Sequence, residues 1–68
     1  MTNEEAWEAY KKKTPVRIGE RWKHGGRVGI IEKVESDASI HAWFGVRIED
    51  SFLRYYGHQQ LHFVEDTQ

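Results

Sequence analysis

Histidines, serines and a glycine-rich segment are the residues of this chain whose types could support catalysis or metal binding. His58 and His62 are four residues apart, a spacing that turns two imidazoles toward one metal ion only on a helix, and no carboxylate completes a ligand set. All three serines fall in polar turns without a nucleophile-elbow pattern. The segment GGRVG at 25–29 matches neither the dinucleotide nor the Walker fingerprint. We therefore expect a non-enzymatic protein with no catalytic residue, no metal site and no cofactor.

The chain of 68 residues contains no cysteine, which excludes disulfides, thiolate metal sites and thiol catalysis. A chain without cysteine is compatible with a reducing compartment, and we expect a cytoplasmic location. The first residues, MTNEEAWEAYKKK, lack the apolar segment of a signal peptide. No apolar run approaches the length that spans a membrane, so we expect no membrane partner.

Positive charge is concentrated in one part of the sequence. Seven basic residues and one acid lie between Lys11 and Arg27, whereas six acids and two basic residues lie between Glu35 and the end. The net charge is only −1, so charge separation rather than overall basicity is the feature to explain. This segment is either a solvated face or a phosphate-binding face for nucleic acid. The nucleic-acid interpretation uses Arg17, Arg21, Lys23, His24 and Arg27.

The N-terminal residues predict a helix that occupies most of residues 1–15. Thr2 and Glu5 form a capping-box pattern, with acidic residues in the first turns and lysines in the last. Trp7 and Tyr10 are three residues apart and therefore share one face. Thr14-Pro15 ends the helix. A helix this short is marginal alone, so it needs a surface on which to dock.

After Pro15 the pattern changes to short strands joined by turns. We expect the first strand to start at Val16 and continue through 21–24 to a turn at Gly25-Gly26, and Gly29 is a candidate bulge. Five strands in about fifty residues favour a mainly β domain, a small closed or half-closed barrel over 16–65 with a polar tail at 66–68. The other predicted strands are 28–34, 40–48, 52–56 and 61–64, with a helical turn at 57–60.

Alternation within two of these strands predicts an exposed surface. In 40–48, Ala42, Phe44, Val46 and Ile48 point one way, so Trp43 and Arg47 point the other. In 52–56 we expect Leu53 and Tyr55 to face the core and Arg54 and Tyr56 to face outward. The resulting partner-binding candidates are Trp43, Arg47, Arg54 and Tyr56, flanked by Lys23, His24 and Arg27. The alternative is that Trp43 receives the Trp7–Tyr10 face of the N-terminal helix.

The order of motifs resembles the SH3-like small barrels of the KOW and Tudor-like type, including the C-terminal Tudor-like module of bacterial repair helicases. The resemblance rests on IGERWKH at 18–24, GGRVG at 25–29, WFGVRI at 43–48 before two acids, and the closing pair Leu61 and Val64. It covers 16–65 as a pattern, and the N-terminal helix is an addition. Trp22 stands where that family usually has a small aliphatic residue.

The resemblance implies a five-stranded SH3-like fold that binds a macromolecule and does not catalyse a reaction. Some of these barrels bind RNA or DNA, and the helicase modules are associated with RNA polymerase. Three functions remain open. We favour an accessory regulator that docks on a larger protein, of the transcription or DNA-processing machinery, such as phages and mobile elements encode. Nucleic-acid binding and a homo-oligomeric barrel with a ligand pore are the alternatives.

Overall fold

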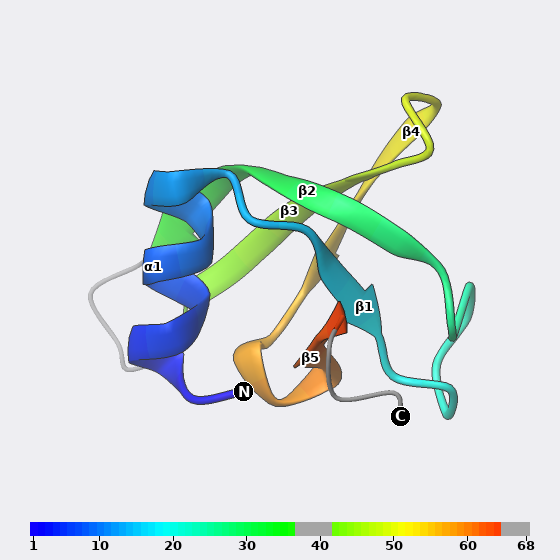
Figure 1. Ribbon diagram of the computed structural model, residues 1–68, viewed down its shortest axis with the longest axis horizontal. Helices are drawn as coiled ribbons and strands as arrows, with labels where there is room; N and C mark the ends of the chain where they lie inside the picture. The colour runs from blue at the N-terminus through cyan, green and yellow to red at the C-terminus, as the bar shows by residue number, and fades with distance from the viewer. Residues whose placement is uncertain (37–41, 65–68) are drawn as a thin grey trace.

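The computed structural model describes residues 1–36 and 42–64, and Figure 1 shows them as one helix against a strongly twisted sheet. The predicted tail 66–68, Glu65 and the first two residues of the predicted strand 40–48 lie outside the described residues. The elements in chain order are α1 (Asn3–Lys12), β1 (Val16–Ile18), β2 (Val28–Ser36), β3 (Ala42–Ile48), β4 (Phe52–Tyr56), the 3-10 helix η1 (His58–Gln60) and β5 (Leu61–Phe63).

The five strands form one antiparallel sheet in the order β4-β3-β2-β1-β5. The expected mainly β architecture with an N-terminal helix is therefore confirmed. Full closure of the sheet into a barrel is not confirmed, because β4 and β5 are the two outer strands and do not pair with each other. The strands β1 and β5 pair over only three residues, which leaves a short ladder at that edge.

The helix begins and ends where its capping residues predict. The Thr2 hydroxyl accepts a hydrogen bond from the Glu5 amide at 3.1 Å, and the Thr2 amide donates to Glu5 Oε1 at 2.8 Å. This capping box satisfies two amides that the first helical turn leaves unpaired. At the other end Lys13 adopts a left-handed conformation with φ of 55°, which stops α1 before Pro15.

The helix docks on the core side of the sheet through small side chains. Ala6 and Ala9 are buried and allow α1 to approach the strands closely. The Trp7 ring packs edge-on against Phe44, with ring centroids 6.0 Å apart, and also against Tyr10. Trp43 precedes Phe44 on β3 and therefore points to the opposite face of the sheet. The alternative in which Trp43 receives the helix is wrong.

The core consists of aliphatic side chains from one face of each strand around a single phenyl ring. Its fully buried members are Val16, Ile18, Ile31, Phe44, Val46, Ile48 and Leu61. They come from β1, β2, β3 and β5 at alternate positions, as strand geometry requires. Burial of side chains of this size stabilises the fold by about 1.5–3 kcal/mol each before the entropy of the chain is subtracted.

Residues 21–24 are turns rather than the continuation of the first strand. The amides of Trp22, Gly25 and Arg27 each donate to the carbonyl three residues earlier, at 3.1, 2.8 and 3.2 Å. His24 has φ of 66° and Gly26 has φ of 84°, values that no strand residue adopts. A Cβ on Gly25 would lie 2.6 Å from the Gly19 carbonyl oxygen, so the turn 19–27 folds tightly on itself.

The bulge predicted at Gly29 lies elsewhere. The register between β2 and β3 shifts between Ile31 and Lys33, three residues after the glycine. Gly29 itself is regularly paired with Ile48 and with Val16. It is glycine because a Cβ there would overlap the Arg47 carbonyl and would lie 2.6 Å from Val46 Cγ1. The close approach of strands, and not a bulge, explains this residue.

Gly29→Ala is expected to destabilise the protein by about 1–3 kcal/mol, because overpacking forces β2 and β3 apart. The matched control is Gly57→Ala. Gly57 has an ordinary φ of −76°, and the nearest atom to its Cβ belongs to the flexible Gln59 side chain at 3.3 Å. Urea unfolding at neutral pH measures both variants. Equal unfolding midpoints for the two variants would contradict the close approach at Gly29.

Candidate functional site

Trp43 and Arg47 lie on the outer face of β3, as the alternation predicts. Trp43 keeps 49% of its surface exposed. Arg47 is half-buried and pairs with Glu32 on β2, where Nη2 lies 3.1 Å from the carboxylate and Nε donates at 3.2 Å. The guanidinium of Arg47 is therefore already bound within the sheet, whereas the indole of Trp43 is available to a ligand.

The predicted orientation of β4 is wrong. Phe44 pairs with Tyr56 across the ladder, and directly paired residues share a face of the sheet. Tyr56 is accordingly only 5% exposed, and its hydroxyl donates to the Lys23 carbonyl at 3.2 Å. Tyr55 is the outward tyrosine, and its hydroxyl donates to Glu35 at 3.1 Å. Both faces of this five-residue strand carry an aromatic ring, so the sequence alone does not reveal which face is buried.

The four predicted partner-binding residues consequently do not form one surface. Trp43 and Arg47 share the outer face, but Arg54 pairs with Val46 and lies on the same face as Tyr56. Arg54 remains exposed near the end of β4, with its guanidinium 5.8 Å from the centroid of the Phe52 ring. The structure therefore separates Arg54 from Trp43 and brings it toward the turn 19–27.

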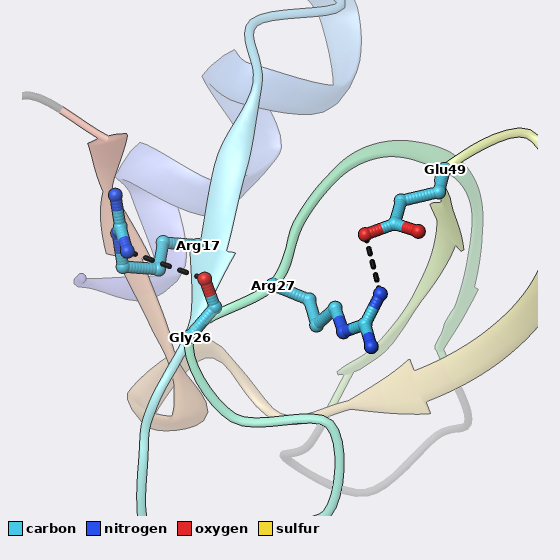
Figure 2. Close-up of polar contacts among 4 residues, drawn as sticks. All are labelled: Arg17, Gly26, Arg27 and Glu49. Carbon is cyan, nitrogen blue, oxygen red and sulfur yellow. Dashed lines mark hydrogen bonds and ion pairs between the residues drawn. The ribbon is translucent and has the colours of Figure 1, made fainter.

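The predicted basic face is also divided. Figure 2 shows Arg17 and Arg27 extending away from each other. Arg17 Nη1 donates to the Gly26 carbonyl at 3.2 Å, whereas Arg27 Nη1 lies 2.6 Å from a carboxylate oxygen of Glu49 at the end of β3. Arg21, Lys23 and Arg27 are exposed, and His24 is half-buried. Five residues that are close in sequence thus do not share one surface.

A pocket of about 200 Å³ brings Trp43 together with a residue that the sequence analysis did not select, Trp22. Trp22 keeps 46% of its surface exposed. The rest of the lining comes from the start of β3 and from the η1 region: Ala42, Gly57, His58, Gln59 and Gln60. Two exposed indoles beside amide side chains form a partly apolar site with polar groups at its rim. We call this site the tryptophan pocket.

Local backbone features hold the tryptophan pocket in shape. A Cβ on Gly19 would lie 3.2 Å from Cδ1 of Trp22, so the glycine leaves room for the indole. The Gly57 amide donates to Gln60 Oε1 at 2.7 Å, which caps η1 beside Trp43. The sequence analysis missed Trp22 because it placed this residue in a strand. One signal could have identified Trp22: the SH3-like barrels that this sequence resembles usually have a small aliphatic residue at this position.

A second hollow, of about 400 Å³, lies between α1 and β5 and is lined by Glu4, Glu8, Ala9 and Phe63 among others. Two of the three glutamates that line it have structural roles within the helix. Glu5, also in the lining, completes the capping box, and Glu8 lies 3.9 Å from Lys12 one turn later. These contacts explain the acidic rim without a ligand, so the tryptophan pocket is the stronger candidate site.

In the described part of the chain, His58 and His62 do not face one another as two metal ligands would. His58 is on η1 and its Nδ1 lies 3.0 Å from the Met1 carbonyl oxygen, while His62 is on β5 and exposed. Among residues 1–36 and 42–64, no three His, Asp or Glu side chains are grouped as metal ligands would be. In the same residues, no helix is both long and apolar enough to cross a membrane.

Two titratable groups sit where the turn 19–27 meets β4. Burial lowers the pKa of His24 from its ordinary value of 6.5, and the positive charges of Arg54, Lys23 and Arg27 lower it further. Burial raises the pKa of Tyr56 above its ordinary value of 10.0, although the nearby Arg54 opposes this shift. Both groups are therefore uncharged at neutral pH.

Comparison of this chain with protein-family models, with curated proteins and with solved structures finds no match.

Tyr56→Phe is expected to destabilise the protein by about 1 kcal/mol, because the Lys23 carbonyl loses its hydrogen-bond donor in a part-buried contact. The neighbouring variant Tyr55→Phe is the control. Its lost bond to Glu35 is exposed, so water replaces it at little cost. Thermal unfolding of both variants measures the difference, and a larger loss in Tyr55→Phe would refute the assigned orientation of β4.

The lowered pKa of His24 predicts that stability decreases with acidification. The unfolded chain takes up a proton at this histidine near pH 6.5, whereas the folded chain does so only at lower pH. This contribution is present above the unfolded pKa and is lost as the pH falls below it. The urea midpoint of unfolding should therefore change more between about pH 7.5 and about pH 5.5 in the unchanged protein than in His24→Asn. Asparagine is the replacement because it tolerates the positive φ at this position. Identical pH dependence of stability in the two proteins would disprove the lowered pKa of His24.

Proposed function

We propose that this chain is a non-enzymatic binding module that docks on a larger protein through the tryptophan pocket. The observation that carries the proposal is the exposure of Trp22 and Trp43 on the same pocket. Large aromatic rings left in water on a small domain are costly to solubility and mark interaction sites. Tryptophan is also the residue most enriched among the side chains that dominate protein interfaces.

The size and lining of the tryptophan pocket define the occupant. About 200 Å³ is enough for one large apolar side chain, and the two indoles supply the apolar contact. Gln59 and Gln60 supply amide donors and acceptors at the rim for the backbone on either side of that side chain. The partner therefore presents a leucine-, methionine- or phenylalanine-like residue on a protruding loop or helix.

The fold proposed for this module is a small SH3-like barrel of the Tudor or KOW type, whose last strand returns to pair with the first. The supporting observations are the strand order β4-β3-β2-β1-β5 and the pairing of β1 with β5. Contacts between the turn 19–27 and β4 cover the gap that the open sheet leaves. Partners in the transcription or DNA-processing machinery remain the predicted class, on the basis of the motif resemblance alone.

The alternative function is that of a homo-oligomeric barrel with a ligand pore. A barrel with a central ligand pore requires several copies, and its stability would depend on protein concentration. Sedimentation at two concentrations distinguishes that assembly from a monomeric docking module.

Trp43→Ala and Trp22→Ala are each expected to weaken partner binding at least tenfold, since an interface anchor of this kind contributes about 2 kcal/mol or more. Affinity capture from bacterial lysate treated with nuclease, followed by titration of the purified captured protein, measures the effect. Tyr55→Ala is the matched control, because this exposed aromatic side chain is not among the residues that line the tryptophan pocket.

The proposal requires a protein that both the unchanged chain and Tyr55→Ala retain and that both tryptophan variants lose. If all four chains retain the same proteins, or if nuclease removes every captured protein, docking through the tryptophan pocket is refuted.

A further inference from the structure

Positive charge gathers where the turn 19–27 meets β4, on residues from two distant parts of the sequence. Lys23, His24 and Arg27 come from the turn, and Arg54 comes from β4. Lys23 and Arg27 lie beside His24 on the turn, and the Arg54 guanidinium lies over the same Phe52 ring against which the His24 ring packs. We call these four residues the cationic cluster.

Two contacts hold the cationic cluster together. The Tyr56 hydroxyl donates to the Lys23 carbonyl at 3.2 Å, which ties the turn to β4. The His24 ring packs on the Phe52 ring, with centroids 4.8 Å apart and planes inclined by 54°. These contacts fix the backbone of the turn at Lys23 and the ring of His24 against β4.

We propose that the cationic cluster binds the phosphate backbone of a single-stranded nucleic acid. The surface differs from the one expected from the sequence, since it includes Arg54 and excludes Arg17 and Arg21. It is also separate from the proposed docking function, because none of its residues lines the tryptophan pocket.

The cationic cluster has fewer negative partners than positive charges. Glu49 neutralises Arg27 at 2.6 Å, but its carboxylate and the guanidinium are both more than half exposed. Within residues 1–36 and 42–64, Lys23 and Arg54 have no carboxylate within ion-pair distance. Like charges placed this close repel one another, and an incoming polyanion relieves that repulsion.

His24 supplies an independent observation. Its Nε2 is buried and has no hydrogen-bond partner within the described part of the chain. A buried ring nitrogen without a partner is unfavourable, and the surrounding cations disfavour its protonation. A phosphate beside Lys23 and Arg54 would compensate those cations and make the protonated imidazole more favourable. Binding at this cluster therefore has a signature at His24 that a contact elsewhere does not produce.

An exposed aromatic ring among the cations favours a single strand over other polyanions. Phe52 keeps 37% of its surface exposed and lies between His24 and Arg54. Unpaired bases supply the flat apolar surface that such a ring contacts, whereas a duplex hides its bases and an acidic peptide has none. The Arg54 guanidinium over the ring is held in place, which reduces the entropy lost when it binds phosphate.

The test is fluorescence anisotropy of a labelled oligothymidylate of about twelve nucleotides over a range of salt. Each neutralised phosphate contributes about −0.7 to the slope of log K against log salt for a single strand, so three cations predict a slope of about −2. Lys23→Gln and Arg54→Gln should each reduce the magnitude of that slope by about 0.7 and weaken binding at low salt.

Lys33→Gln is the matched control, since Lys33 is an exposed cation on β2 outside the cationic cluster. It should leave both affinity and slope unchanged, and so should Trp43→Ala. Urea unfolding of each variant establishes that it is folded. A nuclear magnetic resonance titration of the His24 ring supplies the second measurement, in which the oligonucleotide should raise the pKa of His24.

The proposal is overturned if the oligonucleotide does not bind, or if Lys33→Gln loses as much affinity as Arg54→Gln. It is also overturned if an acidic peptide of equal charge binds as tightly, because the ligand would then be a carboxylate-rich protein. An unchanged His24 pKa in the presence of saturating oligonucleotide would place the bound strand at another surface and equally refute the inference.

Discussion

The packing of the turn 19–27 against β4 is the constraint on which the rest of the structure depends. An open five-stranded sheet would leave one side of its small core in water, since β4 and β5 do not pair. The hydrogen bond from Tyr56 to the Lys23 carbonyl and the contact of His24 with Phe52 cover that side. On the other side Trp7 and the small residues of α1 cover Phe44. The helix and the turn together cover the two sides of the core that the sheet leaves open.

The same turn positions both candidate surfaces. Its tight path requires Gly25 and the left-handed residues His24 and Gly26, and this path directs consecutive side chains apart. Trp22 reaches the tryptophan pocket beside Trp43, whereas Lys23 and His24 meet β4. A change that loosens the turn would therefore affect stability and both surfaces together, while substitutions of single exposed side chains would separate them.

The two surfaces present different chemical groups. The tryptophan pocket contains indoles, amides and His58, and the cationic cluster contains three cations and a histidine that is neutral at neutral pH. Such sets bind through apolar contact and through charge, respectively. A module with both proposed activities would bring a protein and a single strand together.

The sequence by itself determined the elements that depend on nearest neighbours: the helix with its capping box, the five strands and the orientation of β3. Each follows from local hydrogen bonds or from alternation over a long strand. Tertiary structure alone decided the orientation of β4, the path of residues 21–24 and the open edge of the sheet. The physical reason is that Tyr55 and Tyr56 suit the core equally well by composition, and only pairing of Tyr56 with Phe44 and its bond to Lys23 select one of them.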